Sequence, residues 1–117
     1  MNKVIKIATR NGTLEFKPGD NIYRTDYYNG ASKTIKDAEK QVKQDLRSAH
    51  GGAEIGIWEC DCSDFGQPIS EGKLISLWSR VGNNPRQITD PAKLDAYVSH
   101  SRLIAHEKLS LRGRNNE

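Results

Sequence analysis

Two carboxylates and a lysine near the middle of the chain are the residue types that metal-assisted hydrolysis uses. Asp61 ends one predicted strand, and Glu71 and Lys73 begin the strand that returns beside it. Two carboxylates can hold a divalent cation, while a nearby lysine polarises the water that attacks a phosphodiester. The spacing therefore points to a metal-dependent nuclease, and the alternative interpretation is a solvated, charged hairpin end.

The same residues carry a resemblance to a known family. A helix followed by a hairpin, with Asp61 on one strand and Glu71-Gly72-Lys73 on the next, resembles the PD-(D/E)xK nucleases. The sequence departs from that pattern because no proline precedes Asp61 and glycine is the middle residue of Glu-x-Lys. Glu15-Phe16-Lys17 matches the same short pattern. The resemblance implies a nuclease in which Asp61, Glu71 and Lys73 are catalytic.

The soft metal ligands are dispersed along the chain. Cys60 and Cys62 are the only cysteines, and their Cys-x-Cys spacing does not match a structural zinc site. His100 and His106 fall on different faces of a predicted helix. The chain also lacks the glycine patterns of nucleotide-binding loops and the Gly-x-Ser-x-Gly of hydrolases. We predict no metal and no cofactor, with both cysteines reduced and packed beside Trp58.

Basic residues recur every three or four positions on a predicted helix over 33–49. At 100° per residue they fall within about 80° of arc, well away from the apolar face. A narrow basic stripe can follow a phosphate backbone, and aromatic residues in the preceding loop can stack on bases. We therefore predict a nucleic-acid-binding surface, and the alternative is an ordinary solvated helix face. Its residues are Lys33, Lys36, Lys40, Lys43 and Arg47, with Arg24, Tyr27 and Tyr28 from the loop.

The second predicted hairpin, 53–62 with 73–80, carries large apolar residues on both faces. Alternation places Ile55, Ile57, Ile75 and Leu77 on one face and Trp58, Cys60, Leu74 and Trp78 on the other. If both helices cover the first face, the tryptophan face is exposed and forms an interface with a protein partner or a second copy of the chain. The alternative is that one helix covers each face and both rings lie in the core.

These elements define an α+β fold with an antiparallel sheet of two β-hairpins and two helices, in the order ββαββα. The first hairpin has Asn11-Gly12 as its loop, with Ile7 opposite Phe16, because Asn-Gly is the preferred pair for a type I′ turn. Residues 20–31 are predicted to be a loop, and Asn83-Asn84-Pro85 a break. The second helix begins at Asp90-Pro91 and runs to about residue 109. We expect a single domain over 1–111 and a flexible tail over 112–117.

The composition bounds the function further. The 117 residues carry a formal net charge of +3, with 28% charged and 35% hydrophobic residues. No apolar stretch is long enough to span a bilayer or to act as a signal peptide, so we expect a cytoplasmic protein. The first prediction is a non-catalytic binding protein, accessory or inhibitor-like, that acts through an interface with a protein partner or with a second copy of the chain. Nucleic-acid binding is the second prediction, and the metal-dependent nuclease is the third.

Overall fold

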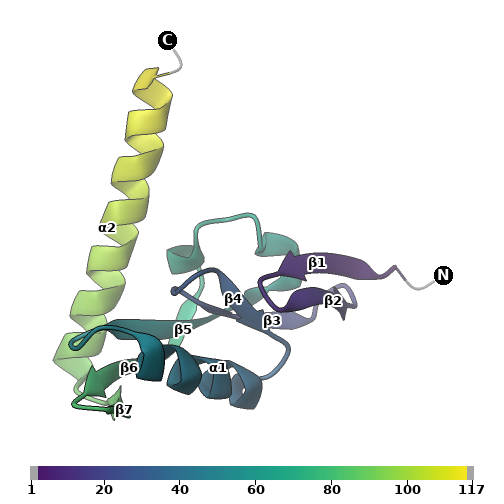
Figure 1. Cartoon of the computed structure of the whole chain (residues 1–117). Coiled ribbons are helices and arrows are strands. Elements are labelled where there is room, and N and C mark those ends of the chain that lie inside the picture. Colours follow the sequence, from purple (N-terminus) through teal and green to yellow (C-terminus); the bar gives the residue numbers. More distant parts are fainter. Residues whose placement is uncertain (1–2, 116–117) are drawn as a thin grey trace.

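The structure is a computed structural model that describes the backbone of residues 3–115 and the side chains of residues 3–108 (Figure 1). These residues form seven strands, two α-helices and two short 3₁₀-helices. The strands are β1 (Ile5–Thr9), β2 (Gly12–Phe16), β3 (Asn21–Thr25), β4 (Gly30–Ser32), β5 (Glu54–Asp61), β6 (Lys73–Val81) and β7 (Asn84–Ile88); the helices are α1 (Ile35–Ser48), η1 (Cys62–Asp64), η2 (Ile69–Glu71) and α2 (Pro91–Asn115).

The strands form an antiparallel sheet in the order β4-β3-β5-β6-β7 and a separate β1-β2 hairpin. The α+β class with two helices and antiparallel sheets is confirmed, but the order ββαββα is wrong. The segment 20–31, predicted to be a loop, contains β3 and β4, joined by a turn in which Tyr28 and Asn29 have positive φ. The predicted break at residues 83–85 is wrong for Asn84 and Pro85, which begin β7. Pro85 is tolerated there because β7 is an edge strand.

The first hairpin forms with a shifted register. Ile7 lies opposite Leu14, and Phe16 lies opposite Ile5, so the loop is Arg10-Asn11 rather than Asn11-Gly12. Both loop residues keep negative φ, whereas Gly12 has a φ of 125°. A type I′ turn needs positive φ at both loop residues, so this turn is of another type. The shift is two residues, which preserves the faces, and Ile7 and Phe16 are buried as predicted.

Helix α1 follows the predicted pattern closely. The Thr34 hydroxyl accepts a hydrogen bond from the Asp37 amide and caps the N-terminus. Ala38, Val42 and Leu46, spaced by four, are fully buried against the sheet. The helix contacts every strand of the five-stranded sheet, so it covers most of one face.

Helix α2 packs against the opposite face. Asp90 caps it through the Ala92 amide, and Pro91 is its first residue, as predicted. It continues to Asn115, past the predicted end near residue 109 and through the first part of the predicted tail; residues 116–117 lie outside the described residues. Its last turns stand clear of the rest of the chain (Figure 1). No helix of the described residues is long and apolar enough to cross a membrane.

The β1-β2 hairpin covers the rest of that face, beside β3 and β4. It forms a second, smaller core with Ile22, Ala31 and Cys62. Both cysteines are free, but Cys62 packs beneath this hairpin rather than beside Trp58. Burial raises the pKa of the Cys60 thiol, with the nearby Arg24 acting in the opposite direction.

Candidate functional sites on the two faces of the sheet

The two tryptophans do not form the exposed patch that alternation predicted. Trp58 has none of its surface exposed, and Trp78 only 8%. Trp78 lies opposite Ile55 and packs beneath α1, whereas Trp58 lies opposite Leu74 and packs beneath α2 near Tyr97. Each helix covers one face of the sheet and one ring.

A β-bulge explains the difference. The register between β5 and β6 shifts between Ile57 and Trp58, so that Ile57 pairs with Ser76 but Trp58 pairs with Leu74. One extra residue on β6, Ile75, reverses which positions share a face. Leu74 was therefore correctly placed with Trp58, and Trp78 was not. Cys60 and Leu74 remain half-buried, but with both rings covered they do not make an apolar interface.

The three residues of the predicted nuclease site have other neighbours. One Asp61 carboxylate oxygen accepts hydrogen bonds from the Ser63 amide at 2.9 Å and the Ser63 hydroxyl at 2.7 Å, which lower the Asp61 pKa. Lys73 lies opposite Glu59 rather than Asp61, and Glu71 belongs to η2. Among the described residues, no group of three histidine, cysteine or acidic side chains could hold a metal ion.

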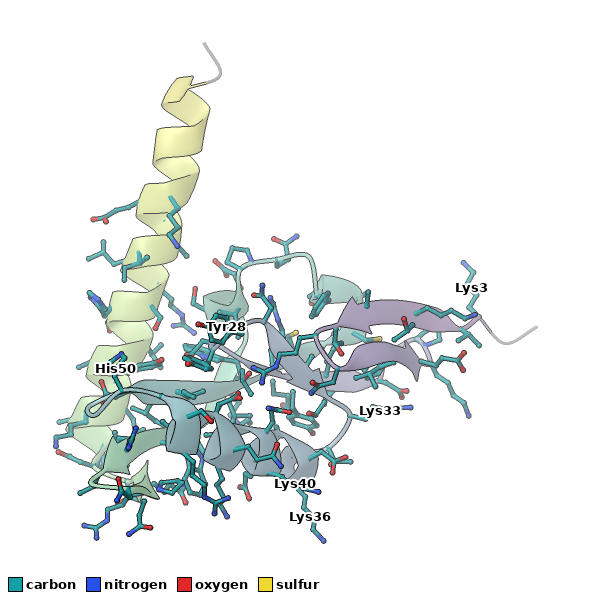
Figure 2. All side chains as sticks on the ribbon, in the orientation of Figure 1. Lys3, Tyr28, Lys33, Lys36, Lys40 and His50 are labelled. Atoms are coloured by element: carbon teal, nitrogen blue, oxygen red, sulfur yellow. The ribbon has the colours of Figure 1, made fainter. Side chains whose placement is uncertain are left out.

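The basic face of α1 is present as predicted. We use this name for Lys36, Lys40, Lys43 and Arg47. Lys36 and Lys40 point away from the sheet into solvent (Figure 2), Arg47 is exposed, and the Lys43 ammonium lies 5.2 Å from the centre of the Trp78 ring. Lys33 precedes the helix and lies over the Phe16 ring.

The basic face has no ion-pair partners within the described side chains. The two ion pairs among the described side chains lie elsewhere and join Lys6 to Glu15 and Arg10 to Asp45. Asp37 and Glu39 flank the basic face and share a shallow hollow with it, but neither carboxylate comes within ion-pair distance of its cations. Among the described side chains, Lys36, Lys40 and Arg47 are therefore exposed without a counter-ion, whereas the Lys43 ammonium lies over the Trp78 ring.

The prediction that Arg24, Tyr27 and Tyr28 extend this surface is wrong in part. Arg24 shares a face with Trp58, on the other side of the sheet from α1, where it donates to the Gln67 carbonyl and lies over the Phe65 ring. Tyr27 is half-buried against the core beneath α1. Tyr28 is 74% exposed but lies away from Lys36 and Lys40 (Figure 2).

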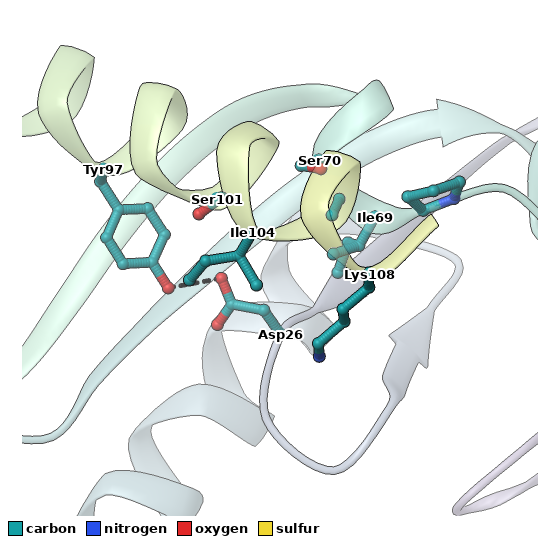
Figure 3. A pocket seen from close by; sticks show the side chains of 9 residues that line it. Asp26, Ile69, Ser70, Tyr97, Ser101, Ile104 and Lys108 are labelled. Carbon is teal, nitrogen blue, oxygen red and sulfur yellow. Dashed lines mark hydrogen bonds between the residues drawn. The ribbon is translucent and has the colours of Figure 1, made fainter. Parts of the chain in front are cut away.

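Sequence reasoning missed a polar cluster centred on Asp26, in the β3-β4 turn. One Asp26 carboxylate oxygen accepts from the Gly56 amide at 2.9 Å. The other accepts from the Trp58 indole N–H at 2.9 Å and from the Tyr97 hydroxyl at 2.5 Å (Figure 3). Burial, and then the adjacent carboxylate, raise the pKa of Tyr97 far above its ordinary value, so Tyr97 remains a proton donor.

Gly56 is required for this cluster because of its close neighbours. A Cβ atom at this position would lie 2.8 Å from an Asp26 carboxylate oxygen and 2.9 Å from the Trp58 indole nitrogen. The three hydrogen bonds thus connect the β3-β4 turn, β5 and α2. The residues come from distant parts of the chain. The one signal available from sequence is the spacing of Leu94, Tyr97 and Val98, which share one face of the second helix.

Comparisons with known protein families, with curated proteins and with solved structures find no match to this chain.

Proposed function

We propose that this chain binds nucleic acid through the basic face of α1. The observation that carries the proposal is a row of four cationic side chains on one helix face, none of them in an ion pair with a described side chain. The apolar side of the same helix is fixed against the sheet, so the row is held in one orientation on a rigid element.

The spacing of these cations lowers the stability of α1 as an isolated helix. Lys36 and Lys40 are four residues apart, as are Lys43 and Arg47, and like charges at this spacing each cost about 0.2–0.5 kcal/mol. A polyanion laid along the helix would replace that repulsion with attraction. The row extends over about 17 Å of helix axis. Duplex DNA carries one phosphate per about 1.7 Å of its own axis, so several phosphates lie within reach.

The chemistry of the row indicates the kind of recognition. Three of the four cations are lysines, which act as point charges rather than as planar forks that read base edges. Contacts to phosphates position a protein but carry no sequence information. We therefore expect binding with little sequence preference.

Fluorescence anisotropy of labelled duplex DNA, single-stranded DNA and RNA at low salt tests the proposal. If four cations each neutralise one phosphate, the logarithm of the affinity for duplex DNA should fall with the logarithm of the salt concentration, with a slope of about −3 to −4. Failure to bind any of the three at low salt, or affinity that does not change with salt, would exclude this function.

Binding to a protein partner is a second proposal, and it rests on α2 instead of the tryptophans. Leu103 of α2 is 54% exposed, and the last turns of this helix stand clear of the rest of the chain (Figure 1). An exposed leucine on a projecting helix is a suitable contact for another helix. Sedimentation of the wild type and of Leu103→Glu, alone and with a cell extract of the source, tests it. An assembly that dissociates in the variant supports the proposal, and a monomer in every condition contradicts it.

A further inference from the structure

A cavity of about 440 Å³ lies between α2 and the segment that leads into β6 (Figure 3). Its walls are largely apolar, with Pro68 and Ile69 on one side and Ile104 and Ala105 on the other. Asp26, Ser70, Tyr97 and Ser101 supply the polar atoms, and Lys108 stands on α2 at its edge. The size and the small number of polar groups are typical of a small-molecule site.

Ser70 contributes a polar group without a partner to the cavity wall. The residue is only 2% exposed and lines the cavity, yet its hydroxyl has no hydrogen-bond partner. Its backbone carbonyl, by contrast, accepts from the Arg102 side chain at 3.0 Å. A buried hydroxyl without a partner is unfavourable, so such groups normally meet a partner in the protein, a water or a ligand.

Asp26 sets the charge that the cavity favours. Its three donors, the Gly56 amide, the Trp58 indole and the Tyr97 hydroxyl, are all neutral. Neither ion pair of the described side chains involves Asp26. The Asp26 oxygen that accepts only the Gly56 N–H can accept one more hydrogen bond, because each carboxylate oxygen has two lone pairs.

We propose that this cavity binds a small organic amine with an apolar body. The ammonium group donates to the open Asp26 oxygen, and a polar group at the other end of the molecule meets Ser70, which lies apart from Asp26 (Figure 3). The apolar body lies between Ile69 and Ile104. The ammonium of Lys108 competes for the same carboxylate from the edge of the cavity. This site lies on the opposite face of the sheet from the basic face of α1 and is independent of the proposed function.

Three matched compounds test the charge preference in the full chain. Phenethylamine, phenethyl alcohol and phenylacetate have similar size and differ in the charge of the head group. Titration is followed by two-dimensional NMR on the amides of Asp26, Ser70 and Ile104. We expect saturable shifts with phenethylamine at millimolar concentration, as is usual for a fragment, and affinity at least about tenfold lower for the other two. Equal affinity for the three compounds, tighter binding of phenylacetate or no saturation with phenethylamine would each overturn the proposal.

Variants locate the compound and determine the role of each group. Ile69→Ala removes part of the apolar wall and should weaken phenethylamine binding severalfold. Ile104→Trp should fill the cavity and abolish binding. Lys108→Met should strengthen binding because it removes the competing cation, and weaker binding in that variant would show an anion site and contradict the proposal. Asp26→Asn should abolish binding, and if it fails to fold, the other three variants still decide the result.

Discussion

α1 and α2 cover opposite faces of one sheet in different ways. α1 contacts every strand of the five-stranded sheet and buries an unbroken row of small and aliphatic side chains against Ile55, Ile57 and Trp78. α2 packs on the other face through Tyr97, which meets Trp58 and a carboxylate, and farther along it leaves a cavity. The first face is closed by apolar packing, so the proposed nucleic-acid surface lies on the outer side of its helix. The second contains polar groups beneath its helix, beside the cavity.

The largest expected effect is that of Trp58→Ala. The ring is fully buried beneath α2, and its N–H is one of the three donors to Asp26. Removing a buried aromatic ring costs about 3–5 kcal/mol. Urea unfolding measures the change. A loss below about 1 kcal/mol, the range of ordinary surface substitutions, would place the ring outside the core.

A pair of aliphatic truncations compares the two faces directly. Leu46→Ala, beneath α1, should cost about 2–5 kcal/mol because the side chain is fully enclosed. Ile104→Ala should cost less than about 1 kcal/mol because Ile104 is 39% exposed and already faces the cavity. Equal losses in urea unfolding would mean that both faces are packed alike.

Tyr97→Phe should cost about 1 kcal/mol near neutral pH through the lost hydrogen bond to Asp26. It should also change the dependence of stability on pH. The folded-state pKa of Tyr97 is raised above its ordinary value of 10.0, so its contribution is fully present below pH 10 and decreases as the pH rises, when the unfolded chain releases the proton first.

Urea unfolding of both proteins at neutral pH and above pH 10 checks this prediction. The wild type should lose more stability than Tyr97→Phe on going to alkaline pH. Tyr23 and Tyr27, whose pKa values are also raised, are present in both proteins, so their effects cancel in the comparison. Parallel losses would show that Asp26 and Tyr97 are not coupled.

The smallest expected effect concerns the outer side of α1. Lys36→Glu replaces the repulsion from Lys40 with an attraction at the same i, i+4 spacing and adds a carboxylate to the first turn of α1. The stability should rise by a few tenths of a kcal/mol, about the value of such helix pairs, while binding to nucleic acid should weaken. Thermal melts and anisotropy on the same sample measure both quantities. A variant that is less stable, or that binds more tightly, would contradict a functional role for these charges.

Helix periodicity was the most informative signal in the sequence. The apolar face of α1 and its basic face follow from spacing alone, because a helix has one period and its side chains cannot change faces. The Asp90-Pro91 start of α2 follows from capping in the same way.

The faces of the second hairpin could not be derived by the same reasoning. Both faces of β5 and β6 are apolar, so nothing in the alternation reveals the bulge at Ile57 and Trp58 that places Trp78 beneath α1. The Asp26 cluster depends on a turn with Tyr28 at positive φ, a conformation that this residue type rarely adopts. It also requires a contact between residues 26 and 97, which no local pattern contains.

A comparison of two double variants with equal charge tests the function of the basic face most directly. Lys36→Glu with Lys43→Glu reverses two charges of that face, whereas Lys3→Glu with Lys108→Glu makes the same change of net charge away from it. Anisotropy with labelled duplex DNA at low salt should show a loss of affinity of at least about tenfold for the first variant and less than about threefold for the second, because local phosphate contacts dominate binding. Equal losses in two variants that remain folded would mean that DNA responds only to overall charge and would contradict a binding site on α1.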